Sequence, residues 1–487
     1  MEQVDPVLRC WGDPYERRKN DQWKSCAVPA WSYGSCRSRT LRGLCPISDG
    51  FGAPQRRRAI TDRAAKMHGM VGASPTASRL RALRRLEARA LVLALVAGAT
   101  LVSCSNPFDS KVEGSNPSTT TRLPNTPISD DAGTSQPTGR TYSLPRTIAA
   151  DCSSDVTSSL SKWLASVPDN STLMLGKGAC YQIEGSLTIA NRRSLLLDGN
   201  GATLQAKTRG TRTRVHFGID DSENIIIRNL TVKGANPRAG AQSSAYNPQF
   251  EAQHGFNLGG VRHVLLDNVE ASDVYGDFVY ISSSGQGKSR GQLSEHVAVV
   301  RSRFSRSGRQ GIAITNGRDV TIRGNEISDV ARSLFDLEPN TEHNAVRGVR
   351  IEQNTTGAAV NFWIASKGAG SQIGDIVVRD NTMRAATGGL VFVFGGRGAA
   401  RGPFAFDGNR LRVTGAVTDE GAVGALFFAN TDTIAIRNNQ IDLPRGRDMP
   451  TVELRSCNHV VVDGNRVQNA NRLVMADQTS SDVRASG

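Results

Sequence analysis

The sequence predicts an all-β fold in which short strands stack coil upon coil into a solenoid. A motif of the form β-x-β-x-x-Asn-x-β, where β is an apolar residue, recurs in the second half of the chain. From Asn325 onward its asparagines are separated by 29, 27, 28, 30 and 26 residues, and a fixed period in this range is typical of solenoids. Helical repeats are excluded because no repeat contains a long enough stretch of period 3.6. Each coil has room for about three strands.

The Asn motif supplies one turn of every coil. We expect each asparagine to adopt the left-handed bend between two strands, and its side-chain amide to bond to the asparagine of the next coil. The complete motifs lie at 320–327, 348–354, 377–383, 404–411, 434–441 and 460–467, with shorter versions at 225–229 and 264–268.

Four other segments, 254–258, 277–282, 310–315 and 333–338, alternate apolar and polar residues at period two, which predicts strands with one buried face. Their alignment predicts an inward column of Phe256, Val279, Ile312 and Phe335, followed by Leu258, Ile281, Ile314 and Leu337. It also predicts outward columns of Asn257, Tyr280, Ala313 and Asp336, then Gly259, Ser282, Thr315 and Glu338. At the strand starts His254, Asp277, Gln310 and Ser333 form a further polar column. Any functional site is therefore expected on this outer face.

The folded body begins with a short helix. Residues 155–165 carry Val156, Leu160, Trp163 and Leu164 at helical spacing, and Ser154 or Asp155 is available as the N-cap. Short apolar segments at 172–175, 181–183, 187–189 and 195–197 predict the first strands. A helix in this place would cover the first apolar layer of the stack.

Together, the Asn-punctuated turns and the leading helix resemble the right-handed parallel β-helix of the pectin-lyase-like superfamily. The resemblance covers residues 146–474 and implies about ten rungs with a short N-terminal capping helix. The motifs around His254, Asp277, Arg309–Gln310 and Asp336–Asn340 are similar to those of largely uncharacterised secreted actinobacterial β-helix proteins. Many members of the superfamily bind or cleave long polysaccharides. The complete motif sets of polygalacturonases, mannuronan epimerases and pectate lyases are missing from this sequence.

Charge and cysteines separate the first 103 residues from the rest. Of the net charge of +14, an excess of +10 lies in residues 1–103, outside the expected folded body, so nucleic acid is not expected as a partner. Residues 1–69 contain Cys10, Cys26, Cys36 and Cys45, whose spacings lack the close pair of a zinc site. We expect 1–69 to be an extension without a fold, and synthesis to begin at Met70 or Met67.

Residues 70–103 have the pattern of a signal peptide, with a basic region followed by the apolar segment 90–102. Leu101-Val-Ser-Cys104 resembles a bacterial lipobox, which implies acylation of Cys104 and attachment to the outer face of the cytoplasmic membrane. An ordinary cleaved signal or a retained anchor is the alternative. Residues 104–145, rich in Ser, Thr and Pro, predict a disordered stalk, and 475–487 a disordered tail. Export permits a disulfide, expected between Cys152 and Cys180, with Cys457 left as a buried thiol.

Asp336 and Glu338 are the main catalytic candidates. They lie two residues apart on one predicted strand and so face the same way, at a separation expected to suit the acid and the base or nucleophile of a retaining or inverting glycosidase. Burial and mutual repulsion would raise the pKa of one of them. Calcium binding, or simple pairing with Arg332 or Arg347, is the alternative.

His254, Asp277 and Arg309 are the other catalytic candidates. Asp277 would orient the imidazole of His254 on the neighbouring rung, and Arg309 would hold a uronate carboxylate or stabilise a developing anion. Each also has an ordinary structural interpretation, as a hydrogen-bonded histidine, a turn cap and a bridge between rungs.

Five further residues are expected to contact substrate: Gln310, Asn340, Tyr280, Trp363 and Lys367. The alternation in 360–364 predicts that Trp363 faces outward as a platform for sugar stacking. Lys367 would serve as the base if the reaction is an elimination. The loop 235–253 is long enough to fold over the site.

These observations predict a monomeric, lipid-anchored extracellular protein that binds a polysaccharide and cleaves or modifies it, with no required cofactor unless Ca²⁺ binds. Hydrolysis through Asp336 and Glu338 is favoured over elimination through Arg309, His254 or Lys367. A pKa split between two carboxyls favours hydrolysis, and a basic groove without such a pair favours elimination or binding. The alternative is a surface module that binds glycans without chemistry.

Overall fold

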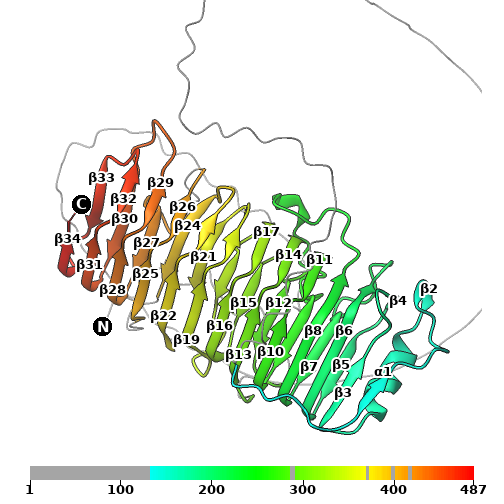
Figure 1. The fold of residues 1–487 in the computed structure, drawn as a ribbon. Helices are drawn as coiled ribbons and strands as arrows, with labels where there is room; N and C mark the ends of the chain where they lie inside the picture. Colours follow the sequence, from blue (N-terminus) through cyan, green and yellow to red (C-terminus); the bar gives the residue numbers. More distant parts are fainter. Residues whose placement is uncertain (1–131, 286–290, 369–371, 396–400, 415–418, 487) are drawn as a thin grey trace, which may run out of the picture. The chain divides into compact units, whose positions relative to one another are not determined.

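A computed structural model describes residues 132–285, 291–368, 372–395, 401–414 and 419–486. The polypeptide winds in coils whose strands pair in parallel with the coils before and after, which confirms the predicted all-β solenoid (Figure 1). The expectations for residues 1–69, for the signal peptide and for Cys104 lie outside these described residues. In the described part of the chain, no helix is both long and apolar enough to span a bilayer.

One sheet, here called the site sheet, takes one strand from each of eleven coils in the described residues, against about ten rungs predicted. Its strands, in order, are β5 (Leu187–Ala190), β7 (Phe217–Asp220), β9 (Phe256–Gly259), β12 (Val279–Ser282), β15 (Ile312–Ile314), β18 (Phe335–Leu337), β21 (Phe362–Lys367), β24 (Gly389–Phe394), β27 (Leu426–Ala429), β30 (Pro450–Arg455) and β33 (Arg472–Ala476). The register pairs Phe256 with Val279, Ile312 and Phe335 in turn. The predicted columns are therefore confirmed.

The other strands form a second sheet that bends at the Asn turns and is here called the bent sheet. Its inward side chains meet those of the site sheet in one continuous apolar core, which includes Ile225, Val264, Ile322 and Phe406. Its strands are β1 (Thr141–Ser143), β2 (Asp151–Asp155), β3 (Ser171–Met174), β4 (Cys180–Gln182), β6 (Arg193–Gln205), β8 (Glu223–Lys233), β10 (Arg262–Asp267), β11 (Glu270–Val274), β13 (Ser294–Val300), β14 (Arg303–Ser307), β16 (Gly317–Arg323), β17 (Glu326–Val330), β19 (Ala345–Glu352), β20 (Thr355–Thr356), β22 (Gln372–Arg379), β23 (Thr382–Met383), β25 (Phe404–Asp407), β26 (Arg410–Arg412), β28 (Asp432–Arg437), β29 (Gln440–Asp442), β31 (Asn458–Asp463), β32 (Arg466–Gln468) and β34 (Ser481–Ala485).

The motif asparagines stack into a buried ladder at the bend. Asn381 is representative: its Nδ2 donates to Asn409 Oδ1 at 2.9 Å and to the carbonyl of Ile351 at 2.8 Å. The predicted amide contact between coils is confirmed. In the complete motifs the left-handed conformation is adopted by the residue before each asparagine and not, as predicted, by the asparagine itself. Asp380, for example, has a φ of 57°. The asparagine side chain hydrogen-bonds the backbone of the adjacent coil at the turn, and the residue before it provides the left-handed conformation of the turn.

A ladder of charges follows a second line along the bent sheet. In the described coils, Arg323 is opposite Glu352, which is opposite Arg379, then Asp407, Arg437 and Asp463. The first coils repeat the pattern with Asp198, Arg228 and Asp267. Opposite charges on neighbouring strands stabilise a sheet, and like charges destabilise it, so this line favours the observed register.

Helix α1 (Thr157–Ser166) begins the stack, where Leu160, Trp163 and Leu164 are buried. The N-cap is Val156 and not Ser154 or Asp155 as predicted, although the Asp155 carboxylate accepts a hydrogen bond from the Thr157 backbone N–H at 2.9 Å. The helix lies at the end of the stack beside β3 and β5 (Figure 1). The predicted disulfide is confirmed between Cys152 and Cys180.

Ordered structure extends beyond both predicted ends of the β-helix, residues 146 and 474. Residues 132–140, here called the strap, run along the outside of the bent sheet instead of belonging to a disordered stalk (Figure 1). Ala132 is buried there against Leu196, Ile226 and Leu265, and β1 pairs with β3. At the other end, β34 pairs with β31 inside the expected tail.

Candidate functional site

The predicted polar columns meet on the outer face of the site sheet around β12, β15 and β18. Register places Asp277, Gln310 and Ser333 at the starts of these three successive strands, and Asp336 lies in the outward column on β18. In the described residues this cluster forms a chain of hydrogen bonds in which most members are almost fully buried. The sequence-based alignment therefore brought the right segments together.

Asp277 organises the first half of this network. Its Oδ2 accepts a hydrogen bond from Arg309 Nη1 at 2.7 Å, and its Oδ1 accepts from the Gln310 backbone N–H at 2.9 Å. Its exposed fraction is 0%, so the carboxylate cannot contact a polymer on the surface. Burial acts to lower the pKa of Arg309, but Asp277 and Asp336 raise it overall, which keeps the guanidinium charged. Asp277 thus positions Arg309 and Gln310.

Gln310 joins Asp277 to the carboxyl pair. Its Nε2 donates to Asp336 Oδ2 at 2.7 Å, and its Oε1 accepts from the Ser333 backbone N–H at 2.7 Å. The residue is 4% exposed. We had expected Gln310 to bind substrate; the structure instead uses both ends of its amide inside the protein, where they fix one oxygen of Asp336.

Asp336 and Glu338 are neighbours two residues apart at the end of β18, and the charge of Glu338 acts on Asp336. Burial and then the charge of Glu338 raise the pKa of Asp336 well above its ordinary value. Burial also raises the pKa of Glu338, although Arg309 and Arg332 oppose the rise. Two neighbouring carboxyls with raised pKa values can act as an acid and a base.

His254 lies beside this pair but is already engaged. Its Nδ1 accepts the Asp277 backbone N–H at 3.1 Å, and its ring stacks on Tyr280 with centroids 4.5 Å apart. Burial lowers the pKa of His254 to about 4, although the Asp277 charge acts in the opposite direction. The imidazole is therefore neutral near pH 7 and carries its proton on Nε2, because Nδ1 is the acceptor. The Asp277 carboxylate orients it less directly than predicted, from 3.4 Å.

The loop 235–253 folds against the start of these strands, as predicted. The Tyr246 hydroxyl donates a hydrogen bond to Glu251 Oε2 at 2.7 Å, and the same oxygen lies 3.6 Å from Arg309 Nε. The guanidinium of Arg332 lies over the Tyr246 ring, 4.9 Å from its centroid. Sequence reasoning gave no role to Glu251 in this site, and it named Arg332 only as a pairing partner of Asp336 and Glu338.

Trp363, which was predicted to contact substrate, does not lie on the outer face. Trp363 is 0% exposed and packs edge-on against Phe335 in the core, so the predicted outward orientation is wrong. The register pairs Ile364 with Phe335, which places two successive residues, Trp363 and Ile364, inside at the strand start. Phe362 replaces Trp363 on the outside, where it stacks on Phe392 with centroids 5.0 Å apart. Asn340 is exposed, two residues beyond Glu338.

Lys367 is unsuited to the role of a base. Its Nζ lies 2.7 Å from Glu420 and 3.4 Å from Asp419. Burial acts to lower the pKa of Lys367, but hydrogen bonding and charge from these two acids raise it above its ordinary value. An elimination base needs the opposite shift.

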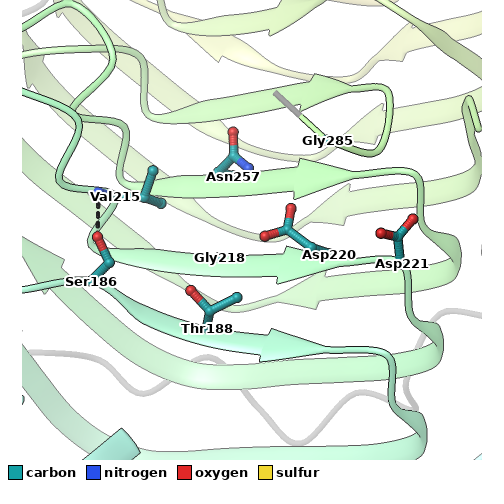
Figure 2. A pocket seen from close by; sticks show the side chains of 8 residues that line it. All are labelled: Ser186, Thr188, Val215, Gly218, Asp220, Asp221, Asn257 and Gly285. Atoms are coloured by element: carbon teal, nitrogen blue, oxygen red, sulfur yellow. Dashed lines mark hydrogen bonds between the residues drawn. The ribbon is translucent and has the colours of Figure 1, made fainter. Parts of the chain in front are cut away.

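A pocket of about 380 Å³ opens on the same outer face, toward α1. Figure 2 shows its polar side chains on neighbouring strands: Ser186, Thr188, Asp220, Asp221 and Asn257. Burial and the neighbouring Asp221 raise the pKa of Asp220. Sequence reasoning missed Asp220, although Phe217-Gly-Ile-Asp220 has the same alternation as the four aligned segments. In the described residues no three His, Cys, Asp or Glu side chains are grouped as metal ligands.

Residues 215–441 match the family model described as a right handed beta helix region. A curated relative, the SPbeta prophage-derived uncharacterized protein YorA of Bacillus subtilis (strain 168), is 29% identical over 140 residues, which are 28% of this chain and 24% of that protein. The chain thus spans about a quarter of the length of the curated relative that it matches.

Solved structures with the same kind of fold differ in activity. The surface adhesin PfbA of Streptococcus pneumoniae has a TM-score of 0.49 at 12% identity, covering 69% of this chain and 91% of that one. The DFA-IIIase of Arthrobacter chlorophenolicus A6 without its lid has a TM-score of 0.48 at 13% identity, with 70% and 93% covered. The A-module of the mannuronan C-5 epimerase AlgE4 of Azotobacter vinelandii has a TM-score of 0.45 at 13% identity, with 71% and 100% covered. These likenesses transfer no activity to this chain.

Proposed function

From the premise that this chain is a right-handed β-helix protein of the pectin-lyase-like fold, we propose that it binds a polysaccharide on the site sheet and hydrolyses a glycosidic bond. The observation that carries this proposal is the pair of neighbouring carboxyls, Asp336 and Glu338, at the outer face of β18, where Gln310 holds Asp336 and burial raises the pKa of both. Two adjacent carboxyls whose pKa values are raised by burial can supply both an acid and a base.

The pair would act as one unit. It donates its proton to the glycosidic oxygen as the bond between that oxygen and the anomeric carbon breaks. Water then adds to the anomeric carbon and returns a proton to the pair, which restores the starting state. Glu338, which is partly exposed, faces the substrate, and Asp336 is 4% exposed behind it. Arg309 and Arg332 stabilise the transient negative charge of the pair.

Hydrolysis fits these residues better than elimination. Elimination requires a base that abstracts a carbon-bound proton and a free cation that neutralises the uronate carboxylate. His254 already uses Nδ1 as an acceptor, Lys367 is paired with two acids, and Arg309 is held by Asp277. None of the three is placed for the role that elimination would give it.

A digest of a broad glycan panel tests the proposal. We expect new reducing ends from the parent protein, with no ultraviolet absorbance from an unsaturated product. Asp336→Asn and Glu338→Gln should abolish cleavage while binding persists. The unsaturated product would refute hydrolysis, and cleavage that survives both substitutions would remove the pair from the mechanism.

The second candidate is a glycan-binding module without chemistry. It is favoured by one observation: Asp277, Gln310 and Asp336 satisfy one another inside the protein, as structural networks do. Binding to a glycan without any new reducing ends across the panel would establish this alternative.

We further propose that the protein is exported and anchored through Cys104. The disulfide between Cys152 and Cys180 supports export, since such bonds persist in oxidising compartments. Metabolic labelling with a fatty acid should mark the parent protein and not Cys104→Ala. Equal labelling of both proteins would refute acylation at this residue.

A further inference from the structure

His254 presents a hydrogen-bond donor on the outer face of the site sheet. Its Nδ1 lies 3.1 Å from the backbone N–H of Asp277. A backbone N–H always donates, so Nδ1 must offer its lone pair, and a neutral imidazole then carries its proton on Nε2. The Asp277 carboxylate lies farther from Nδ1, at 3.4 Å, and it already accepts shorter hydrogen bonds from Arg309 and from the Gln310 backbone.

The Nε2 atom is the part of the ring that remains for a ligand. His254 is 4% exposed, and its Nε2 forms no hydrogen bond with any residue that the structure describes. The Nε2 atom of His216 also lacks a partner among the described residues, but that atom is sealed from solvent and the Nε2 atom of His254 is not. Because a nearly buried donor without a partner is unfavourable, a ligand that supplies an acceptor at this atom gains a hydrogen bond.

The surrounding chain fixes the orientation of this donor. The imidazole stacks on the Tyr280 ring with an interplanar angle of 2°. On the other side of Nδ1, the backbone of Gly276 approaches so closely that a Cβ there would lie 2.8 Å from this atom. The His254 carbonyl also accepts the backbone N–H of His216 at 3.0 Å. A donor held in this way loses little conformational entropy when a ligand binds.

The donor and the carboxyl pair lie on the same face. The His254 ring reaches the start of β12 through the Asp277 N–H, and β12 pairs with β15, which pairs with β18. Two strand spacings correspond to roughly 10 Å. A glycan lying along this face can therefore place one sugar unit at His254 and the bond to be broken at Asp336 and Glu338.

We propose that His254 binds the substrate by donating a hydrogen bond from Nε2 to a neutral oxygen of a sugar unit near the carboxyl pair. Arg309 is held between Asp277 and Glu251, so recognition at this position depends on a neutral donor and a hydroxyl, ether or carbonyl oxygen. This role is the opposite of that of a base, which would need a lone pair on Nε2. The inference rests on the proposed polysaccharide function and adds a residue that contacts its substrate.

Two substitutions separate the two nitrogens of the ring. His254→Asn keeps an acceptor for the Asp277 N–H and removes the Nε2 donor, whereas His254→Gln carries an amide N–H to the position of Nε2. The probes are polygalacturonate, alginate, xylan and mixed-linkage β-glucan, with Kd measured by titration calorimetry. For a polymer that the parent binds, His254→Asn should raise Kd about tenfold, the effect of losing one hydrogen bond. His254→Gln should recover most of this loss.

The kinetic effect should appear in KM and not in kcat, because the hydrogen bond is present in the bound substrate and in the transition state alike. His459→Asn removes an exposed imidazole from β31 of the bent sheet and is the matched control, which should bind like the parent. Urea unfolding verifies that all three variants are folded.

An isotope label in the histidine nitrogens gives a readout that a purely structural role would not change. The Nε2–H resonance of His254, assigned by its absence from His254→Asn, should shift when the polymer binds. A resonance that stays in place with polymer bound overturns the inference. So does a His254→Asn variant that binds like the parent, a loss that His254→Gln does not recover, or a parent that binds none of the four polymers.

Reducing ends, measured in parallel, separate this inference from the proposed function. If a polymer binds through His254 but is never cleaved, hydrolysis fails and the binding role of His254 stands. If a polymer is cleaved through Asp336 and Glu338 while His254→Asn behaves like the parent, the binding role fails and hydrolysis stands.

Discussion

Replacing His254 should change how the stability of the protein depends on pH. Burial lowers the pKa of His254 from 6.5 to about 4, so the native state binds this proton less tightly than the unfolded state by about 3 kcal/mol. Above pH 6.5 both states are neutral and the full stability is present. As the pH falls toward 4, only the unfolded chain takes up the proton, and this stability is lost. The loss amounts to about 2 kcal/mol by pH 5.

His254→Asn is the informative substitution, because the Asn Oδ1 can accept the Asp277 N–H in place of Nδ1. The variant loses the stacking on Tyr280 at every pH, so the comparison is between slopes. Urea unfolding from pH 8 to pH 5 should show that the parent loses about 2 kcal/mol more than the variant. His343→Asn, at an exposed position, should follow the parent. Parallel curves for parent and His254→Asn would refute the neutral, buried imidazole.

Four further predictions concern named contacts. Asp336→Asn should become more stable relative to the parent as the pH rises from 4 to 8. The pKa of Asp336 is raised in the native parent, so the native state keeps a proton that the unfolded state releases, and the parent loses stability as the pH rises. Urea midpoints of the two proteins that differ equally at all pH values would contradict this. Gln310→Ala should lower the kcat of the proposed hydrolysis by about a hundredfold with little change in KM, because Asp336 loses the hydrogen-bond donor that orients it. An unchanged kcat would show that this hydrogen bond is dispensable. Asn381→Ala should cost about 3 kcal/mol or more in urea unfolding, since it leaves buried partners unsatisfied, whereas Asn458→Ala, at an exposed position, should cost less than about 1 kcal/mol. Trp363→Ala should lower the free energy of unfolding by about 3–5 kcal/mol and leave glycan affinity unchanged. Weaker glycan binding by this variant would instead support the predicted surface role of Trp363.

The fold was predictable because its signals are local and repeated. Alternation at period two identified the strands of the site sheet, and the spacing of the asparagines identified the coils. Alternation failed at the strand starts, where the chain turns inward and two successive side chains enter the core. Trp363 was assigned to the wrong face for this reason. The strap was missed because Ser- and Pro-rich composition indicates disorder unless an apolar surface receives the chain, and Leu196 and Ile226 provide one.

The site was predictable in its location and less so in its contacts. Register alone brought Asp277, Gln310 and Asp336 together, because the alignment fixes which residues lie on adjacent strands. Alignment gives no side-chain rotamer, so it could not indicate that both Nε2 and Oε1 of Gln310 would form hydrogen bonds within the protein. That outcome depends on packing against the loop 235–253, whose conformation has no periodic signal.

The alternating charges on the bent sheet constrain how such a protein can change in length. Removing the single coil that carries Asp407 would bring Arg379 opposite Arg437. Adding one coil, with either an acidic or a basic residue at this position, would also place two like charges opposite each other. Removing two adjacent coils would preserve the alternation. The asparagine line from Asn325 to Asn465 imposes no such parity, since each of these coils presents the same amide. Duplications and losses in the lineage of this protein should therefore have been tolerated most readily in twos.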